Sequence, residues 1–239
     1  MPLQQRMTDY HCHILPGIDD GPKEQYESIE MARLLAEAGY RKVYCTPHLI
    51  KGMYEVSNEE VLYERDKLQR ELVKEGIGIK LLAGREYYLD EFLLDYISKP
   101  LLLEGTSCMM IEIPSNTSVD LVKETIFAIK RRGYNPLIAH PERCFLLEMV
   151  EREPQGAGKW KRWFSRGRVQ NKGKELGNEL LFYFKQLECQ FQGNLGSLNG
   201  QYGGRVKASA LYFEKTGVYT HAGTDAHSAD AVKDILWIR

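Results

Sequence analysis

Histidine is scarce in this chain, and most of it sits in short polar clusters that follow apolar, strand-like runs. Five of the six histidines lie in the segments His11-Cys12-His13, Thr46-Pro47-His48, His140-Pro141-Glu142-Arg143 and Thr224-Asp225-Ala226-His227. Both imidazoles of a His-x-His segment project to the same face of a strand, because side chains alternate. Imidazole nitrogen and carboxylate oxygen together suit hard or borderline divalent ions. The pattern therefore predicts a multinuclear metal centre at strand ends.

Carboxylates at equivalent places complete the candidate ligand set. The nine residues are His11, His13, Asp20, His48, Glu86, Glu112, His140, Asp225 and His227. Nine ligands exceed what one ion takes, so they suit two or three ions with a bridging carboxylate such as Glu86. Taken singly, Glu112 fits a paired buried carboxylate equally well, and His48 fits a turn cap. The sixth histidine, His221, lies inside the last apolar run and is predicted to be structural.

The elements that must position these residues alternate along the chain. The predicted strands cover residues 8–12, 42–46, 79–83, 108–113, 137–139, 189–192 and 218–222. Amphipathic segments between them predict helices over 25–38, 57–76, 119–132 and 207–215, the second opened by a Ser57-x-x-Glu60 capping box. Seven strand–helix units predict an α/β fold with parallel strands. A closed, TIM-like (β/α)7 barrel is favoured over an open sheet, because ligands from nearly every unit must meet at one rim.

Bulk composition narrows the functional classes. The chain has 239 residues and a net charge of −1, which suits one domain over 1–239 and gives no argument for nucleic acid or an anionic membrane. No apolar run resembles a membrane span or a signal peptide. Cys12, Cys45 and Cys108 lie inside apolar runs, which favours reduced thiols and a cytoplasmic location. No cysteine precedes an arginine by six residues, so the thiol-phosphatase loop is absent.

One segment interrupts the strand–helix alternation. Residues 151–175 are rich in Lys and Arg and hold Trp160, Trp163 and Phe164. They predict an insertion after the fifth strand. A solvated loop with an aromatic anchor is the simpler interpretation, and a docking surface for an acidic peptide or lipid headgroups is the alternative. The glycine-rich stretch 193–204 is predicted to be a flexible turn, with phosphate contact by its amides as the alternative.

The ordered motifs resemble the PHP (polymerase and histidinol phosphatase) superfamily of metal-dependent phosphoesterases. More narrowly, they are similar to bacterial manganese-dependent tyrosine phosphatases of the CpsB/YwqE type, which accompany capsule and exopolysaccharide genes. The motifs are His11-Cys12-His13-Ile14, Ile18-Asp19-Asp20-Gly21-Pro22-Lys23, Thr46-Pro47-His48, Gly84-Arg85-Glu86, Ile111-Glu112-Ile113-Pro114 and His140-Pro141-Glu142-Arg143. The resemblance implies a distorted seven-stranded barrel and a phosphotyrosine tail of a bacterial tyrosine kinase as substrate. Membrane contact would then come only through that kinase.

The resemblance also implies how the ligands divide among three Mn2+ ions. One ion takes His11, His13, Glu86 and Asp225; a second takes Glu86, Glu112 and His140; the third takes Asp20, His48 and His227. Asp20 is preferred because it precedes Gly21-Pro22, although spacing alone leaves Asp19 open. Iron, zinc or magnesium also fits these donors.

The predicted catalytic set is Arg143, Glu112 and His48. A metal-held hydroxide would attack phosphorus, and Arg143 would grip the phosphate through paired hydrogen bonds. A salt bridge from Arg143 to Glu142 or Glu86 is the alternative for that arginine. The family pattern often continues with Asn and a downstream Arg. Here Ser228 follows His227, and a second phosphate-binding arginine would have to come from elsewhere, such as Arg205.

Two other functions compete with the tyrosine phosphatase. One is a small-molecule phosphatase of the same superfamily, such as histidinol phosphatase. The other is a catalytically inactive barrel that holds metal and serves as an adaptor, which a complete set of nine ligands disfavours.

Overall fold

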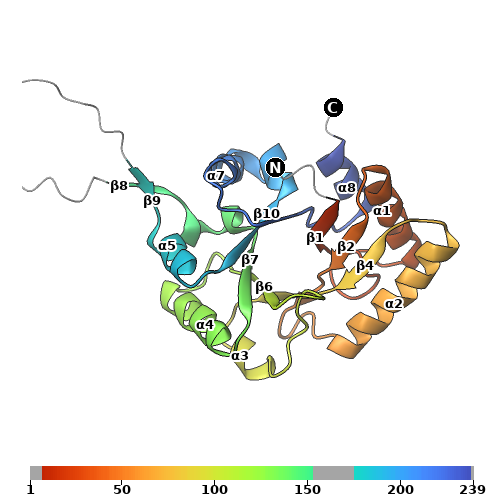
Figure 1. Cartoon of the computed structure of the whole chain (residues 1–239), viewed down its shortest axis with the longest axis horizontal. Coiled ribbons are helices and arrows are strands. Elements are labelled where there is room, and N and C mark those ends of the chain that lie inside the picture. Colours follow the sequence, from red (N-terminus) through yellow and green to blue (C-terminus); the bar gives the residue numbers. More distant parts are fainter. Residues whose placement is uncertain (1–6, 153–174, 238–239) are drawn as a thin grey trace, which may run out of the picture.

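The structure is a computed structural model that describes residues 7–152 and 175–237. Most of the predicted basic and aromatic insertion, residues 153–174, lies outside the described residues. Its flanks pair as a short antiparallel ribbon, β8 (Val150–Arg152) with β9 (Glu175–Gly177), which extends away from the body of the molecule (Figure 1).

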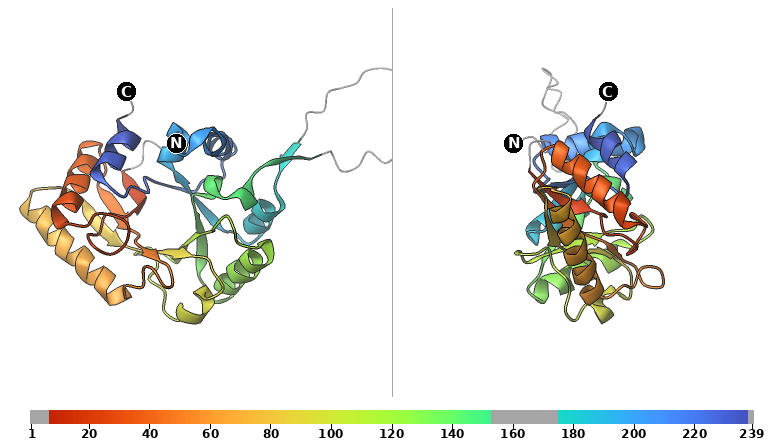
Figure 2. Two further views of the ribbon diagram at one scale, coloured as in Figure 1. Left: turned by 180° about the vertical axis from the view of Figure 1, so that it is seen from behind. Right: turned by 90° about the vertical axis from the view of Figure 1, so that its right-hand side faces the viewer.

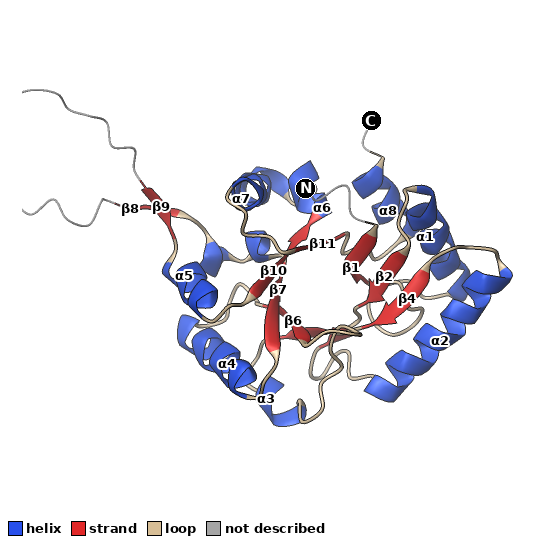
Figure 3. Ribbon diagram, in the orientation of Figure 1, coloured by secondary structure: helices blue, strands red, loops and turns tan. Residues whose placement is uncertain are grey.

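The strands form two parallel sheets ringed by helices (Figure 3). The three-stranded sheet has the order β1 (Thr8–Cys12), β2 (Lys42–Cys45), β4 (Lys80–Ala83). The six-stranded sheet has the order β11 (His221–Gly223), β10 (Gln190–Asn194), β7 (Asn135–Ala139), β6 (Cys108–Glu112), β5 (Glu86–Tyr88), β3 (His48–Leu49). The predicted α/β class with parallel strands is confirmed.

Two strand segments are interrupted just before a candidate ligand, His48 in one and Glu86 in the other. β2 and β3 are separated by Thr46-Pro47, and β4 and β5 by Gly84-Arg85. The same two chain segments pair on both sides of the break, with Cys45 opposite Ala83 and His48 opposite Glu86. Proline cannot donate to a ladder, and a Cβ on Gly84 would lie 2.5 Å from Leu103. These residues therefore end one sheet and start the next.

The first and last strands lie side by side. Asp225 N donates to His11 O at 2.7 Å, and His13 N donates to Ala226 O at 3.1 Å. A Cβ on Gly223 would lie 2.5 Å from the Cβ of His11, so only glycine permits this approach. The contact joins the two sheets at the level of the histidines.

Helices cover the outside of the strands (Figures 1 and 2). Their bounds are α1 (Gln25–Glu37), α2 (Asn58–Lys74), α3 (Leu93–Tyr96), α4 (Val119–Arg131), α5 (Glu179–Gln186), α6 (Leu195–Asn199), α7 (Gly203–Lys215) and α8 (Ala229–Leu236). The capping box before α2 is confirmed, since Ser57 Oγ accepts from Glu60 N and Glu60 Oε2 accepts from Ser57 N. Two 3₁₀ turns follow β7, η2 (Pro141–Arg143) and η3 (Phe145–Leu147).

Strand alternation separates the core from the site. On β6, Met109 and Ile111 pack into the core cluster that includes Ile126 of α4. Cys108 and Met110 face the other way, with Leu137 of β7. Glu112 continues their face at the carboxyl end of the strand.

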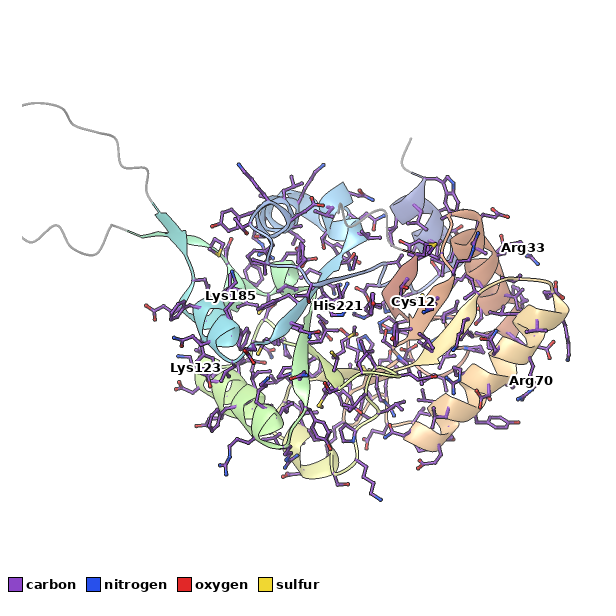
Figure 4. All side chains as sticks on the ribbon, viewed as in Figure 1. Cys12, Arg33, Arg70, Lys123, Lys185 and His221 are labelled. Carbon is purple, nitrogen blue, oxygen red and sulfur yellow. The ribbon has the colours of Figure 1, made fainter. Side chains whose placement is uncertain are left out.

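Some sequence expectations are corrected. The glycine-rich stretch is not a flexible turn, because residues 193–199 form the end of β10 and then α6. The last strand begins at His221 rather than at residue 218. Cys12, Cys45 and Cys108 are buried and free, as predicted, and so are the other two cysteines, Cys144 and Cys189. His221 is structural, as predicted: its Nδ1 bonds Thr220 Oγ1 at 2.9 Å and its ring packs edge-on against Tyr10 among the strands (Figure 4).

Candidate metal centre

The nine candidate ligands converge at the carboxyl ends of the strands. They come from the end of β1, the first residues of β3 and β5, the end of β6, and the segments after β1, β7 and β11. Three overlapping groups have donor atoms within 4.8 Å of one another: His11, His13, Glu86 and Asp225; His48, Glu86 and Glu112; and His13, Asp20, His48 and His227.

The first group lies deepest. His11 Nε2 lies 3.1 Å from Glu86 Oε2 and 3.3 Å from Asp225 Oδ1. His13 Nε2 lies 3.3 Å from each of the same two oxygens. The side chains of His11, His13 and Glu86 are fully buried. Two imidazole nitrogens and two carboxylate oxygens thus point at one enclosed point, which is the donor set and shape that a divalent ion requires.

The second group lies around the other side of Glu86, and His140, which belongs to none of the three groups, adds an imidazole there. His140 Nε2 lies 3.0 Å from Glu86 Oε1 and 3.9 Å from Glu112 Oε1. His48 Nδ1 lies 3.1 Å from Glu86 Oε2 and 4.0 Å from Glu112 Oε2. Among the described residues, buried Glu86 Oε2 and His48 Nδ1 have no hydrogen-bond partner. Buried polar atoms normally have a hydrogen-bond partner, so a carboxylate oxygen and an imidazole nitrogen without one fit a role as metal ligands.

The third group is the most open. His227 Nε2 lies 3.3 Å and His48 Nε2 3.8 Å from Asp20 Oδ1, and the Asp20 side chain is 46% exposed. The rings of His13 and His227 stack at 3.9 Å. His13, His48 and Glu86 each belong to two groups, whereas the predicted division shared only Glu86. The prediction also placed His140 with Glu86 and Glu112, where the structure groups His48.

Residues outside the nine candidate ligands hold the histidines in place. Asp19 Oδ2 accepts from His13 Nδ1 at 2.7 Å, so Asp19 orients a candidate ligand while Asp20 lies among the ligands. Gln192 Oε1 lies 2.8 Å from His11 Nδ1, and the Asp225 carbonyl lies 2.9 Å from His227 Nδ1. Such partners fix which imidazole nitrogen faces a metal. No motif marks Gln192 in the sequence.

Two candidate ligands carry unusual backbone conformations. His140 has φ 29° and Asp225 has φ 53°, both in the left-handed region. Non-glycine residues rarely adopt it, and they do so where surrounding contacts enforce it. For Asp225 those contacts include the bond from its N–H to His11 O and the bond from Asn194 Nδ2 to its Oδ2 at 2.9 Å.

Electrostatic coupling within the centre is strong. Burial alone raises the pKa of Glu86, but the imidazoles of His11, His13 and His140 outweigh burial and hold that pKa well below its usual range. Burial and the charge of Glu86 raise the pKa of Glu112 to about 8. Burial and Arg143 lower the pKa of His140 to about 4, which keeps this imidazole neutral and able to bind a metal at neutral pH.

Known proteins share the sequence and the fold of this chain. The family model described as "Capsular polysaccharide synthesis, CpsB/CapC" matches residues 7–153. Tyrosine-protein phosphatase YwqE of Bacillus subtilis is 30% identical over 224 residues, which cover 93% of this chain and 78% of YwqE. The chain belongs to the CpsB/CapC family. The predicted family resemblance is therefore confirmed.

Other CpsB/CapC relatives agree. The putative tyrosine-protein phosphatase CapC of Staphylococcus aureus is 26% identical over 225 residues, 93% of this chain and 77% of CapC. YwqE of Bacillus subtilis and CpsB of Streptococcus pneumoniae are described as metal-dependent tyrosine phosphatases. A crystal structure from this pair of proteins superposes on the present chain with a TM-score of 0.74 and 27% identity. It covers 96% of this chain and 85% of that one. Histidinol phosphate phosphatase of Lactococcus lactis, at a TM-score of 0.52, 15% identity and coverage of 94% and 89%, shares the fold.

Within this CpsB/CapC site, Arg143 is a cation in direct contact with a candidate ligand. Its Nη1 lies 2.5 Å from Asp225 Oδ2, and its guanidinium lies 4.7 Å from the ring centre of Tyr202. The alternative interpretation was an ion pair with Glu142 or Glu86, and the structure pairs Arg143 with Asp225 instead. Glu142 is buried and accepts instead from Asn194 N and Tyr219 Oη. Arg205 lies close by, with Nη2 3.4 Å from Arg143 O and its guanidinium over Phe145.

Proposed function

We propose that this chain is a metal-dependent protein-tyrosine phosphatase that acts on a bacterial tyrosine kinase controlling capsular or exopolysaccharide synthesis. The observation that carries the proposal is the convergence of eight imidazole and carboxylate side chains in three overlapping groups, with His140 beside Glu86 as the ninth, at one rim of a CpsB/CapC-family chain. Proteins of this family bear the name tyrosine-protein phosphatase in Bacillus subtilis and Streptococcus pneumoniae.

The nine residues are proposed as ligands of up to three Mn2+ ions. His11, His13, Glu86 and Asp225 would hold the deepest ion; Glu86, Glu112 and His140 the second; and Asp20, His48 and His227 the most exposed. The donors are nitrogen and oxygen without thiolate, which suits manganese and leaves iron, zinc and magnesium as competitors. When bound, such ions supply an activated water and neutralise phosphate charge.

The side chains at the open edge would meet the substrate. Arg143, 30% exposed, offers its guanidinium to phosphate oxygens. Glu112 and His48, 19% and 12% exposed, border the same opening and complete the proposed catalytic set. A tyrosine leaving group has a pKa near 10, so the proposal needs no strong general acid.

Two architectural details belong to the same proposal. If β2 with β3, and β4 with β5, each count as one interrupted strand, the sheets become one distorted seven-stranded barrel closed where β1 meets β11. The chain would then be a single domain with an insertion near residues 151–175.

A cytoplasmic location, supported by the free cysteines, would expose it to the kinase tail. Among the described residues, no helix is long and apolar enough to cross a membrane.

The decisive experiment compares three substrates on metal-loaded protein: a phosphotyrosine peptide, a phosphoserine peptide and histidinol phosphate. We expect hydrolysis of the phosphotyrosine peptide, its loss with EDTA, and its loss in His11→Ala. His221→Ala is the matched control, since His221 is a strand histidine outside the ligand set and should retain activity. Full activity after chelation, or in His11→Ala, would contradict the metal mechanism. A preference for histidinol phosphate would indicate the small-molecule phosphatase. No hydrolysis by fully metal-loaded protein would indicate the adaptor.

A further inference from the structure

A groove between α1 and α8 opens directly onto the third ligand group. Its cavity measures about 670 Å³ and is lined by His227, Gly21, Tyr26, Arg33, Glu75 and Asp230, among others. Gly21 follows Asp20 in the chain, and His227 Nε2 lies 3.3 Å from Asp20 Oδ1. One end of the groove is therefore part of the candidate metal centre. Figures 1 and 2 show the two helices side by side.

The groove follows one face of α1. Tyr26, Ile29, Glu30 and Arg33 line it, and their spacing places them on the same side of the helix. The seven residue steps of helix from Tyr26 to Arg33 rise about 10 Å, which matches about three residues of extended peptide. Arg33 lies on the outer side of α1, away from Cys12 at the strands (Figure 4). The groove thus leads from the metal rim outward.

The groove carries more negative than positive charge. Its lining includes the carboxylates Glu27, Glu30, Glu75 and Asp230 but only the cations Lys23 and Arg33. Arg33 already pairs with Glu30 at 2.8 Å and Glu75 at 3.4 Å. Lys23 Nζ already donates to Asp19 O at 2.8 Å. Asp230, next to the His227 end, is 89% exposed and pairs with Lys233 Nζ at 3.3 Å, an exposed pair that contributes little energy and leaves the carboxylate open to a basic ligand. A ligand in the groove would therefore meet carboxylate oxygens.

Tyr26 adds an exposed aromatic surface. Its side chain is 70% exposed although it lies in the first turn of α1. An aromatic face beside carboxylates attracts the stem and the cationic head of Lys or Arg. The combination selects against phosphate-rich or acidic ligands.

We propose that this groove binds the residues that flank the phosphorylated tyrosine of the substrate, and that it prefers basic flanking residues. The inference rests on the proposed function and adds the class of peptide that this site takes. Tyr26 and Asp230 are assigned as specificity-determining residues, while the metal rim acts on the phosphate itself.

The test compares two phosphotyrosine peptides, one flanked by Lys and Arg and one by Asp and Glu, with p-nitrophenyl phosphate as a substrate that has no flanks. The basic peptide should show a KM about twofold to fivefold lower than the acidic peptide, the range of an exposed ion pair. Asp230→Lys should abolish this preference. Tyr26→Ala should lower kcat/KM for the basic peptide relative to p-nitrophenyl phosphate by about fivefold.

Matched controls separate the groove from general effects. Tyr63→Ala removes a tyrosine of similar exposure, 62%, from α2. Asp120→Lys reverses an exposed first-turn carboxylate on α4. Both should behave like the wild type with all three substrates. Equal losses on peptide and p-nitrophenyl phosphate, no change in either groove variant, or a preference for the acidic peptide would overturn the proposal.

A binding measurement keeps the groove testable if the phosphatase activity fails. Fluorescence anisotropy of the labelled peptides with metal-loaded protein and EDTA-treated protein should show tighter binding of the basic peptide, lost in Asp230→Lys. That result without hydrolysis would support the groove and refute the proposed function. Hydrolysis with equal binding of both peptides would support the proposed function and refute the groove.

Discussion

Gln192 Oε1 lies 2.8 Å from His11 Nδ1 and accepts from His140 N at 3.2 Å. The other end of the same amide, Nε2, donates to Gly193 O at 2.8 Å, which fixes the oxygen as the end facing the histidines. The proton of neutral His11 must then be on Nδ1, and the lone pair of Nε2 points at Glu86 and Asp225. A single buried amide therefore orients His11 and the backbone of His140 together.

Replacing Gln192 should weaken metal binding. Gln192→Leu removes the acceptor for His11 Nδ1, so we expect the affinity for Mn2+ to fall about 10–100-fold, the usual effect of losing such an outer partner. Calorimetric titration with Mn2+ measures this. Gln190→Leu, which removes an amide from the same strand that accepts only from Cys108 Sγ, should bind Mn2+ as the wild type does. Equal affinities in all three proteins would refute the orienting role.

The metal-free protein should lose stability as the pH rises from about 6.5 to 9. Burial disfavours the His11 imidazolium, but Glu86 and Asp225 outweigh burial and raise the pKa of His11 to about 9. A histidine whose pKa is higher in the folded state stabilises the fold fully at a pH below its pKa in the unfolded state, about 6.5. This stabilisation is lost as the pH rises through the pKa of the folded state. The loss in the free energy of unfolding should reach up to about 3 kcal/mol.

Urea unfolding across this pH range, with and without Mn2+, measures the effect. The metal-loaded protein should not show the decline, because ions replace the protons between the same ligands. A metal-free protein that is equally stable or more stable at pH 9 would contradict the expected coupling.

Arg143→Ala should reduce kcat/KM for a phosphotyrosine peptide by about 10²–10³, the effect of removing one donor to a developing anionic charge. Arg143→Lys should recover only part of the activity, since an ammonium lacks the paired N–H geometry. Arg143 also contacts Asp225, so Mn2+ affinity must be measured in parallel. If excess Mn2+ restores full activity to Arg143→Ala, the arginine acts through Asp225 and not on phosphate.

Asp19 and Asp20 should differ in what their removal costs. Asp20→Asn should bind one ion fewer by elemental analysis, with stability within about 0.5 kcal/mol of the wild type because the side chain is half exposed. Asp19→Asn should keep the ion count but lose about 1–3 kcal/mol, since Asp19 accepts from Gly21 N, His48 N and His13 Nδ1 in a buried position. The opposite pattern would exchange their roles.

The sequence revealed those parts of the site that depend on residue type and local period. The His-x-His pattern predicts two imidazoles on one face, and His11 and His13 do lie in the same group. Strand alternation does not account for Asp225 and His227, which follow β11 and belong to different groups, with Asp225 at φ 53°. Carboxyl ends of parallel strands meet at one edge, which brought in Glu112 and His140. These inferences need no knowledge of long-range packing.

The sequence did not predict the features of the site that depend on long-range packing. Gln192 reads as an ordinary polar residue in a strand, and its role appears only when β10 lies between β7 and β11. The breaks at Pro47 and Gly84 are visible as residues, but the switch from one sheet to the other depends on Leu103 filling the space beside Gly84. Gly196 favoured a turn by propensity, yet α6 forms because Leu195 and Leu198 are buried and the Asn194 side chain caps its first turn.

The contact between the first and last strands also sets when the centre can exist during synthesis. His11 and Asp225 are 214 residues apart in the chain, yet they belong to the same four-residue group. A nascent chain that has exposed only its first half presents His11, His13 and Glu86 without Asp225 or His227. The full set of proposed ligands therefore exists only after translation has passed residue 227, so a shorter ribosome-bound chain lacks part of the proposed metal site.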